Sequence, residues 1–184
     1  MLKLKTMAGD HPITLPLKQG KIATPGIELD FADVSRASTA FKRVVRDMEF
    51  DVAELAIITF LMAKALGKPL ALLPAVLAGR FQHPFLGYNA ARGPLAPSDL
   101  AGKKVGTRSY SVTTGTWLRG ILAHHHGVDI DKVEWITTDE PHVAEFRDPP
   151  NVTRISKDKD MATLLREGAI DAAIIGEGLP REDW

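Results

Sequence analysis

The sequence predicts an α/β protein with mostly parallel sheets, and three observations lead to this fold class. Short apolar runs of strand length alternate with segments whose apolar residues recur at the spacing of an amphipathic helix. Glycine and proline separate many of these segments. Of the 184 residues, 45% are hydrophobic and 25% are charged, which is ordinary for a chain that buries a core. We expect two small α/β lobes, at 1–90 and 91–184.

Strands and helices alternate along the first half of the chain. Strands are expected where apolar and polar side chains alternate or where a short run is wholly apolar. Helices are expected where apolar residues recur at i, i+3, i+4 and i+7. The predicted elements are strands at 2–7, 27–31, 50–55, 70–77 and 85–90, and helices at 38–48 and 59–66.

A stretch rich in proline and glycine, 92–102, predicts a crossover between the lobes. A second set of alternating elements follows it, which favours a parallel sheet in this half as well. The predicted elements are strands at 103–107, 133–137 and 170–175, helices at 112–125 and 160–167, and a loop at 141–151.

Composition excludes several classes of protein. Lys plus Arg and Asp plus Glu both number 23, and this zero net charge argues against binding to nucleic acid or to a membrane surface. The absence of cysteine excludes disulfides, thiol catalysis and thiolate metal sites. The most apolar stretch, 55–66, is too short to span a bilayer, so we expect no membrane insertion. No secretory signal opens the sequence, which predicts a cytoplasmic protein, or a periplasmic one whose signal has been removed.

The segment 106–115 is the strongest candidate for an anion site. It joins a predicted strand to a predicted helix, where Ser111 is expected to cap the helix and Thr113 and Thr114 lie in its first turn. With Arg108 beside it, such a helix start suits a carboxylate or phosphate, although a capped helix without a ligand fits the same pattern. No P-loop or dinucleotide motif occurs.

Other candidate site residues follow predicted strands in the first half. Because ligands of parallel sheets bind beyond the carboxyl ends of the strands, these side chains are expected to line one wall of a cleft. Arg80 suits a carboxylate, and His83 suits proton transfer because an imidazole can both accept and donate a proton. The remaining candidates are Asp10, His11, Glu54, Thr59 and Phe81.

Two conspicuous features are assigned structural roles. The run His124-His-His126 precedes Gly127, where histidines interact favourably with the end of a helix, and adjacent helical residues cannot share one metal. Trp117 is expected to pack in the core. No spacing of His, Asp and Glu predicts a metal site.

Seven short motifs follow one another along the chain: Ala8-Gly-Asp10, Gly26-Ile-Glu-Leu-Asp30, Arg80-Phe-Gln-His83, Leu100-Ala-Gly-Lys-Lys-Val-Gly106, Ser111-Val-Thr-Thr, Trp117-Leu-Arg-Gly-Ile-Leu122 and Gly168-Ala-Ile-Asp-Ala-Ala173. Their order resembles the 4,5-dihydroxyphthalate decarboxylase family across essentially the whole chain. This resemblance implies the type 2 periplasmic-binding-protein fold, with two α/β lobes and a ligand cleft between them. Since members of that family continue further, we expect the chain to be a fragment that lacks part of its C-terminal lobe.

The resemblance implies non-oxidative decarboxylation of an aromatic dicarboxylate without a cofactor. His83 is then the proton carrier, Glu54 or His11 the second titrating group, and Arg80 with the 111–114 loop the anchor. The expected partner is a small aromatic or carboxylate ligand, and a homo-oligomer remains open. Two alternatives use the same fold: a substrate-binding protein of an ABC-type transporter and a cytoplasmic biosynthetic enzyme.

Overall fold

The computed structural model describes residues 1–175, which form two compact units with one β-sheet in each. Unit 1 comprises residues 1–79 together with 142–146, and unit 2 comprises 80–141 together with the described chain from 147 onward. The predicted α/β class is therefore confirmed. The lobe boundary was predicted at 90/91, whereas the units separate after Gly79 and a short later segment returns to unit 1. Residues 176–184, the C-terminal end of the chain, lie outside the described residues.

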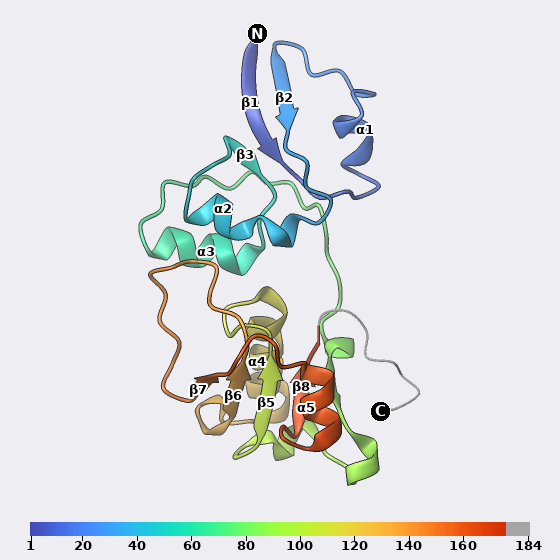
Figure 1. The fold of residues 1–184 in the computed structure, drawn as a ribbon, viewed down its shortest axis with the longest axis vertical. Helices are drawn as coiled ribbons and strands as arrows, with labels where there is room; N and C mark the ends of the chain where they lie inside the picture. Colours follow the sequence, from blue (N-terminus) through green and yellow to red (C-terminus); the bar gives the residue numbers. More distant parts are fainter. Residues whose placement is uncertain (176–184) are drawn as a thin grey trace. The chain divides into compact units, whose positions relative to one another are not determined.

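Unit 1 contains a parallel sheet of three strands in the order β2-β1-β3 (Figure 1). The β1–β2 register runs from Leu2 opposite Ile27 to Thr6 opposite Phe31. Because all three strands run the same way, the segments that follow β1 and β3 emerge at one edge of the sheet. The strands are β1 (Leu2–Met7), β2 (Ile27–Phe31) and β3 (Val52–Ala53).

Helices and one returning segment complete unit 1. Its helices are α1 (Leu15–Lys18), α2 (Phe41–Val45) and α3 (Ile57–Ala65). Val44, Val45 and Ala63 are buried in a core that also contains Met7 of β1. Val143, from the segment 142–146, is 1% exposed in the same core. The later half of the chain thus supplies part of the interior of unit 1.

Unit 2 contains five strands in the order β4-β8-β5-β6-β7. The pairings β8–β5, β5–β6 and β6–β7 are parallel, and the edge strand β4 runs antiparallel to β8. The predicted parallel arrangement therefore holds for all but this edge strand in the described chain. The strands are β4 (Leu86–Tyr88), β5 (Lys104–Thr107), β6 (Glu134–Thr137), β7 (Val152–Arg154) and β8 (Ala172–Ile174).

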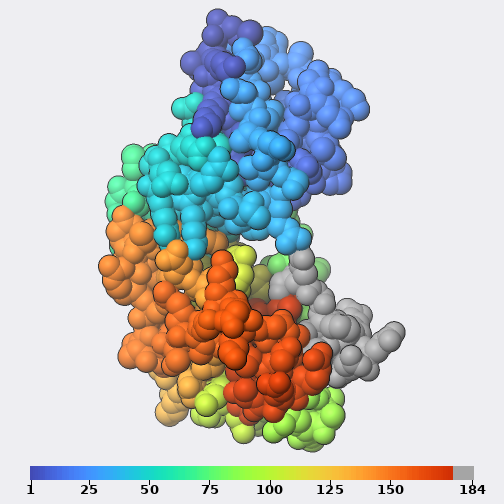
Figure 2. Space-filling model, viewed as in Figure 1, coloured from blue at the N-terminus to red at the C-terminus, as the bar shows by residue number. Residues whose placement is uncertain are grey.

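Helices cover both faces of this second sheet. The helix α4 (Thr113–His126) packs with Val105 and Trp135, whereas α5 (Met161–Glu167) packs with Ile136 on the opposite face. Figure 1 shows α4 behind the strands and α5 in front of them. In Figure 2, orange and red atoms of the chain after β6 make up much of the visible face of unit 2. Because both faces are covered, the central strands β5, β6 and β8 are buried except at the first residue of β5 and of β6.

Several sequence-based elements differ from the structure. The predicted strand at 70–77 is wrong: this segment has no strand partner, and Val76 is 81% exposed. Pro74 lacks the N–H that a strand ladder needs, and apolar character alone supplies no neighbouring strand. The predicted helix at 38–48 is shorter, because only α2 and a preceding 3-10 turn at Ala37–Thr39 form. The short elements α1 and β7 were not predicted.

None of the helices within residues 1–175 combines the length and the apolar character needed to cross a membrane.

Candidate functional site

The edge of the unit 1 sheet holds a histidine–carboxylate pair. Nε2 of His11, after β1, lies 3.0 and 3.1 Å from the two carboxylate oxygens of Glu54, after β3. The backbone N–H of Gly9 donates to the same carboxylate at 2.9 Å. The Glu54 side chain is 14% exposed and that of His11 is 32% exposed. The carboxylate is thus sheltered while the imidazole stays accessible.

Local backbone geometry fixes this pair. A side chain at Gly9 would place its Cβ 3.0 Å from Nε2 of His11 and 3.3 Å from the carbonyl oxygen of Ser35, so only glycine fits without displacement. The Thr14 hydroxyl donates to the Gly9 carbonyl at 2.6 Å and accepts from the His11 backbone N–H at 3.0 Å. The turn from 9 to 14 therefore holds the imidazole against Glu54.

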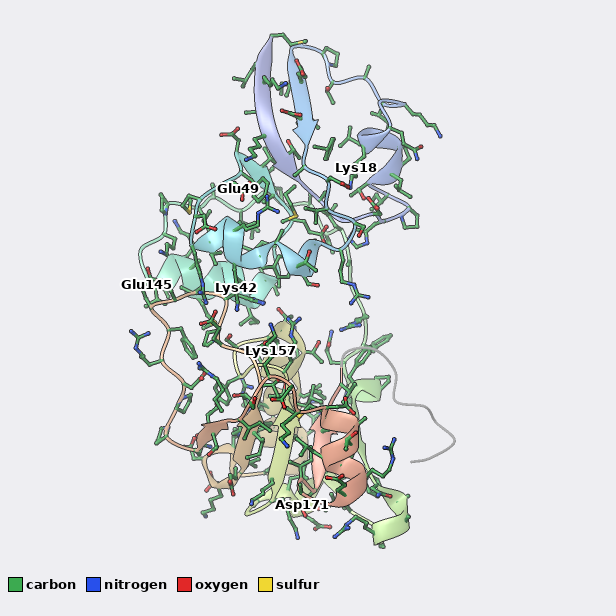
Figure 3. All side chains as sticks on the ribbon, in the orientation of Figure 1. Lys18, Lys42, Glu49, Glu145, Lys157 and Asp171 are labelled. Atoms are coloured by element: carbon green, nitrogen blue, oxygen red, sulfur yellow. The ribbon has the colours of Figure 1, made fainter. Side chains whose placement is uncertain are left out.

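Lys18 braces the neighbouring loops of unit 1 and is labelled in Figure 3. Its ammonium donates to the Asp10 carboxylate at 2.5 Å and to the carbonyls of Ala8 and Val34 at 3.1 and 3.0 Å. Asp10, a predicted ligand residue, is therefore engaged in an ion pair. No motif in the sequence marks Lys18, because its partners come from two separate loops.

Thr59 lies in the interior of unit 1 rather than on an open wall. It is 1% exposed, and its hydroxyl lies 2.9 Å from Nδ1 of His142. The His142 ring meets Phe41 edge-on at 5.5 Å between centroids, and Arg46 donates to the His142 carbonyl at 2.8 Å. Thr59 thus secures the returning segment 142–146, which no sequence pattern indicated.

Hydroxyl side chains gather at the carboxyl ends of β5 and β6 in unit 2. Thr107 and Thr137 are paired in register and are 1% and 0% exposed. Within residues 1–175 neither hydroxyl has a hydrogen-bond partner. The buried hydroxyls of Ser109 and Ser111 lie 3.3 Å apart. Sequence reasoning singled out Ser111 only as a helix cap and did not single out Thr107 or Thr137, although hydroxyl residues at the ends of predicted strands could have indicated both.

The first turn of α4 adds two half-exposed hydroxyls, those of Thr113 and Thr114. The predicted capping role of Ser111 is wrong, because Val112 is the N-cap residue and makes no side-chain cap. The Ser111 hydroxyl lies beside that of Ser109 instead. Arg80 donates to the Thr114 hydroxyl at 3.3 Å. The structure thus brings together Arg80 and Thr114, which were both predicted to bind a ligand.

The segment beginning at Arg80 is exposed. The Arg80 guanidinium lies over the ring of Phe85, 3.9 Å from its centroid. Phe81 is 85% exposed. His83 is also exposed, at the start of a 3-10 turn spanning His83–Phe85. These three predicted residues therefore lie on the surface of unit 2.

Further cations surround an acid that follows β6. Nε of Arg108 lies 3.8 Å from the Asp139 carboxylate, and Nζ of Lys157, labelled in Figure 3, lies 3.5 Å from it. The Lys157 side chain is 81% exposed and that of Arg108 is 51% exposed. Positive side chains thus follow β5 and β7 at the same edge as the hydroxyls, which favours an anionic ligand there.

Two residues of α4 reverse the expected pattern of burial. Trp117, predicted to be in the core, is 56% exposed, whereas Arg119 is 9% exposed. The Arg119 guanidinium lies over the ring of Tyr110, 3.7 Å from its centroid, as a buried cation does when it packs against an aromatic face. The His124-His-His126 run closes α4 before Gly127, whose φ of 65° ends the helix as expected.

The two units therefore offer different chemistry. Unit 1 presents an imidazole whose proton position is fixed by a carboxylate, which suits proton transfer. Unit 2 presents hydroxyls, guanidinium groups and a helix N-terminus, which suit the binding of carboxylate oxygens. Within residues 1–175 no three His, Asp or Glu side chains gather as a metal site would require.

Comparison with known proteins supports the family relationship predicted from the sequence. The 4,5-dihydroxyphthalate decarboxylase of Comamonas testosteroni is 25% identical over 187 residues, which cover 94% of this chain and 54% of that protein. The protein of the same name from Pseudomonas putida is 24% identical over 181 residues, which cover 94% of this chain and 70% of that protein. The chain thus spans about half the length of the first relative. No protein-family model matches the sequence.

Proposed function

We propose that this chain belongs to a decarboxylase of an aromatic dicarboxylate such as 4,5-dihydroxyphthalate, and that its two units are the lobes of a type 2 periplasmic-binding-protein fold. The observation that carries the activity is the His11–Glu54 pair, in which a sheltered carboxylate and the Gly9 N–H fix an accessible imidazole. Relatives named 4,5-dihydroxyphthalate decarboxylase support the substrate class.

The pair supplies the base. When Nε2 of His11 donates to Glu54, Nδ1 keeps the lone pair that accepts a proton. In the proposed reaction this nitrogen removes the proton of the ring hydroxyl para to the carboxylate that leaves. The resulting negative charge raises the electron density at the ring carbon that bears this carboxylate.

His83 supplies the proton that this carbon takes up. The bond between the ring and the carboxylate then breaks, and its electron pair restores the aromatic ring as CO2 leaves. The imidazolium of His11 returns its proton to the ring oxygen, which gives the dihydroxybenzoate. His11 thus ends in its starting form, whereas His83 takes up a proton from solvent before the next cycle, so the net change is one proton in and one CO2 out.

Unit 2 supplies the anchor. Arg80 and the hydroxyls of Thr113 and Thr114 hold a carboxylate of the substrate at the start of α4, with Arg108, Ser111 and Phe81 on the neighbouring loops. Asp10 of unit 1 orients the loop that carries His11 through its ion pair with Lys18. Thr59 contributes only by securing His142.

The test is a proton NMR time course of the 184-residue chain with 4,5-dihydroxyphthalate in D2O. The expected product is 3,4-dihydroxybenzoate with deuterium at the ring carbon that lost its carboxylate, since the proton there comes from solvent-exchanged groups. The variant Glu54→Gln keeps the shape of the side chain and is expected to remove most of the turnover. Substrate signals that broaden without conversion would overturn the decarboxylase proposal in favour of a binding protein.

A further inference from the structure

A buried arginine lies beneath the anion site of unit 2. Arg119 is 9% exposed, and its guanidinium carbon lies 3.7 Å from the centroid of the Tyr110 ring and 5.5 Å from that of Trp135. Nη2 donates to the Thr116 hydroxyl at 3.0 Å. The charge is therefore enclosed by two aromatic rings and one hydroxyl.

No carboxylate compensates this charge within residues 1–175. Nη1 of Arg119 is buried without a hydrogen-bond partner there, and the ion pairs of Asp139 are with Arg108 and Lys157. Burial lowers the pKa of Arg119, but a guanidinium remains charged at neutral pH. Since enclosing a cation without a counter-charge is costly, the uncompensated guanidinium favours a bound anion nearby, which residues 1–175 do not themselves supply.

The orphaned Nη1 atom lies against the first turn of α4. A Cβ built on Gly115, in that turn, would lie 3.3 Å from Nη1 and 3.7 Å from the hydroxyl of Thr107. The Thr107 hydroxyl is also buried without a partner in the described chain. Two unsatisfied polar groups thus both lie close to Gly115, in the turn whose N–H groups form the positive end of the helix.

A second guanidinium contacts the same turn. Arg80 donates to the hydroxyl of Thr114, the residue before Gly115. Consecutive residues of one helical turn therefore each have a guanidinium beside them, one exposed and one buried. Together with the helix dipole they provide positive potential for more than one negative charge.

We propose that Arg119 is a positioning residue that makes the α4 N-terminus select a dianion, such as an aromatic dicarboxylate, over a monoanion. This inference rests on the anion-holding part of the proposed function. Nη1 is enclosed, so Arg119 acts on the ligand through its electric field across the first turn rather than by contact. The energy of such a field is proportional to the charge of the ligand. Removing the cation should therefore weaken the binding of a dianion roughly tenfold more than the binding of a monoanion.

The experiment compares three ligands of different charge by isothermal titration calorimetry: phthalate, benzoate and catechol. In Arg119→Met we expect the ratio of phthalate to benzoate affinity to fall about tenfold, with catechol affinity unchanged. Arg119→Lys restores most of the ratio because it keeps the charge. Lys132→Met, at the opposite edge of the sheet, serves as the matched control and leaves the ratio unchanged.

Several outcomes would overturn this inference. An equal loss of affinity for all three ligands in R119M would show that Arg119 only packs, and an unchanged ratio would remove its role altogether. If R119M does not fold, R119Q is measured against R119K by the same ratio. Failure of the wild-type chain to bind phthalate would also refute the proposal.

The ratio is a binding measurement and is independent of turnover. A charge-dependent ratio without formation of 3,4-dihydroxybenzoate would reject the decarboxylase proposal and keep the assignment of Arg119. Turnover accompanied by an unchanged ratio in R119M would reject only the assignment of Arg119.

Discussion

Both units direct the segments after their parallel strands to one edge of a sheet, yet the side chains at these two edges differ. In unit 1 the polar groups satisfy one another: His11 meets Glu54, and Lys18 meets Asp10 and two carbonyls. In unit 2 the Thr107 and Thr137 hydroxyls and Nη1 of Arg119 are buried without partners in the described chain.

This difference teaches how the two edges divide the proposed work. A group that moves protons needs a fixed hydrogen-bond partner to set its protonation state. A site that holds an anion needs positive charge and hydrogen-bonding capacity that the chain itself leaves uncompensated. Unit 1 fits the first requirement and unit 2 fits the second, and the predictions below test that division from the largest expected effect to the smallest.

Replacing His11 should give the largest loss of turnover. His11→Gln removes the proposed base, and we expect kcat to fall by at least about 100-fold while phthalate affinity stays within about twofold. The matched control is His125→Gln, which alters an exposed histidine near the end of α4 and should leave kcat unchanged. Retained turnover in H11Q would remove His11 from the mechanism, and the same assay on H83Q decides the role of the exposed His83.

Replacing Arg80 should affect binding instead of the chemical step. Arg80→Met removes the cation beside Thr114, so we expect phthalate to bind roughly tenfold more weakly while kcat at saturation changes little. Calorimetry and saturation kinetics measure the two quantities. A fall in kcat with unchanged affinity would contradict the assignment of anion binding to unit 2.

Replacing Thr59 should lower stability without affecting the ligand. Thr59→Val removes the buried hydrogen bond between the Thr59 hydroxyl and Nδ1 of His142, which we expect to reduce the free energy of unfolding by about 1–2 kcal/mol. Thr39→Val, which removes an exposed hydroxyl, is the control and should change it by less than about 0.5 kcal/mol. Denaturant unfolding measures the free energy of unfolding of both variants. If T59V bound phthalate more weakly under conditions in which it is fully folded, Thr59 would belong to the ligand site.

The smallest effect concerns acid stability. Hydrogen bonds from Arg43 and then Lys5 lower the pKa of the Glu49 carboxyl in unit 1 from 4.5 to about 2. The ionised Glu49 carboxylate therefore stabilises the folded state fully above pH 4.5. This stabilisation is lost as the pH falls toward 2. Glu49→Gln should lose less stability than wild type across that interval, as measured by far-UV circular dichroism melts. Parallel pH curves for the two proteins would contradict the assignment.

Local patterns predicted most strands and helices, and long-range contacts account for what they missed. The strands β5 and β6 and the helix α4 follow from the apolar pattern, with Gly102 before β5 and Gly127 after α4. The run 70–77 has the same apolar character, but no strand lies beside it, and this pairing is invisible in the run itself. The segment 142–146 joins unit 1 through partners that lie far away in sequence, such as Thr59 and Arg46.

The candidate site was predictable to a similar extent. Residues after strand ends were found because parallel strands bring their carboxyl ends to one edge, and this placed His11 and Glu54 together. Arg119 was missed because a charged residue in a helix is normally expected to face solvent. Its burial depends on Tyr110 and Trp135, whose positions only the folded sheet defines.

The most direct test of the division between the two edges is to measure kcat for 4,5-dihydroxyphthalate and Kd for phthalate on one preparation of Glu54→Gln. The side chain keeps its size while losing the charge that fixes the His11 imidazole. We predict that kcat falls by about 100-fold or more while Kd stays within about twofold. A Kd that rises in parallel with the fall in kcat would contradict the division, because unit 1 would then hold the anion as well.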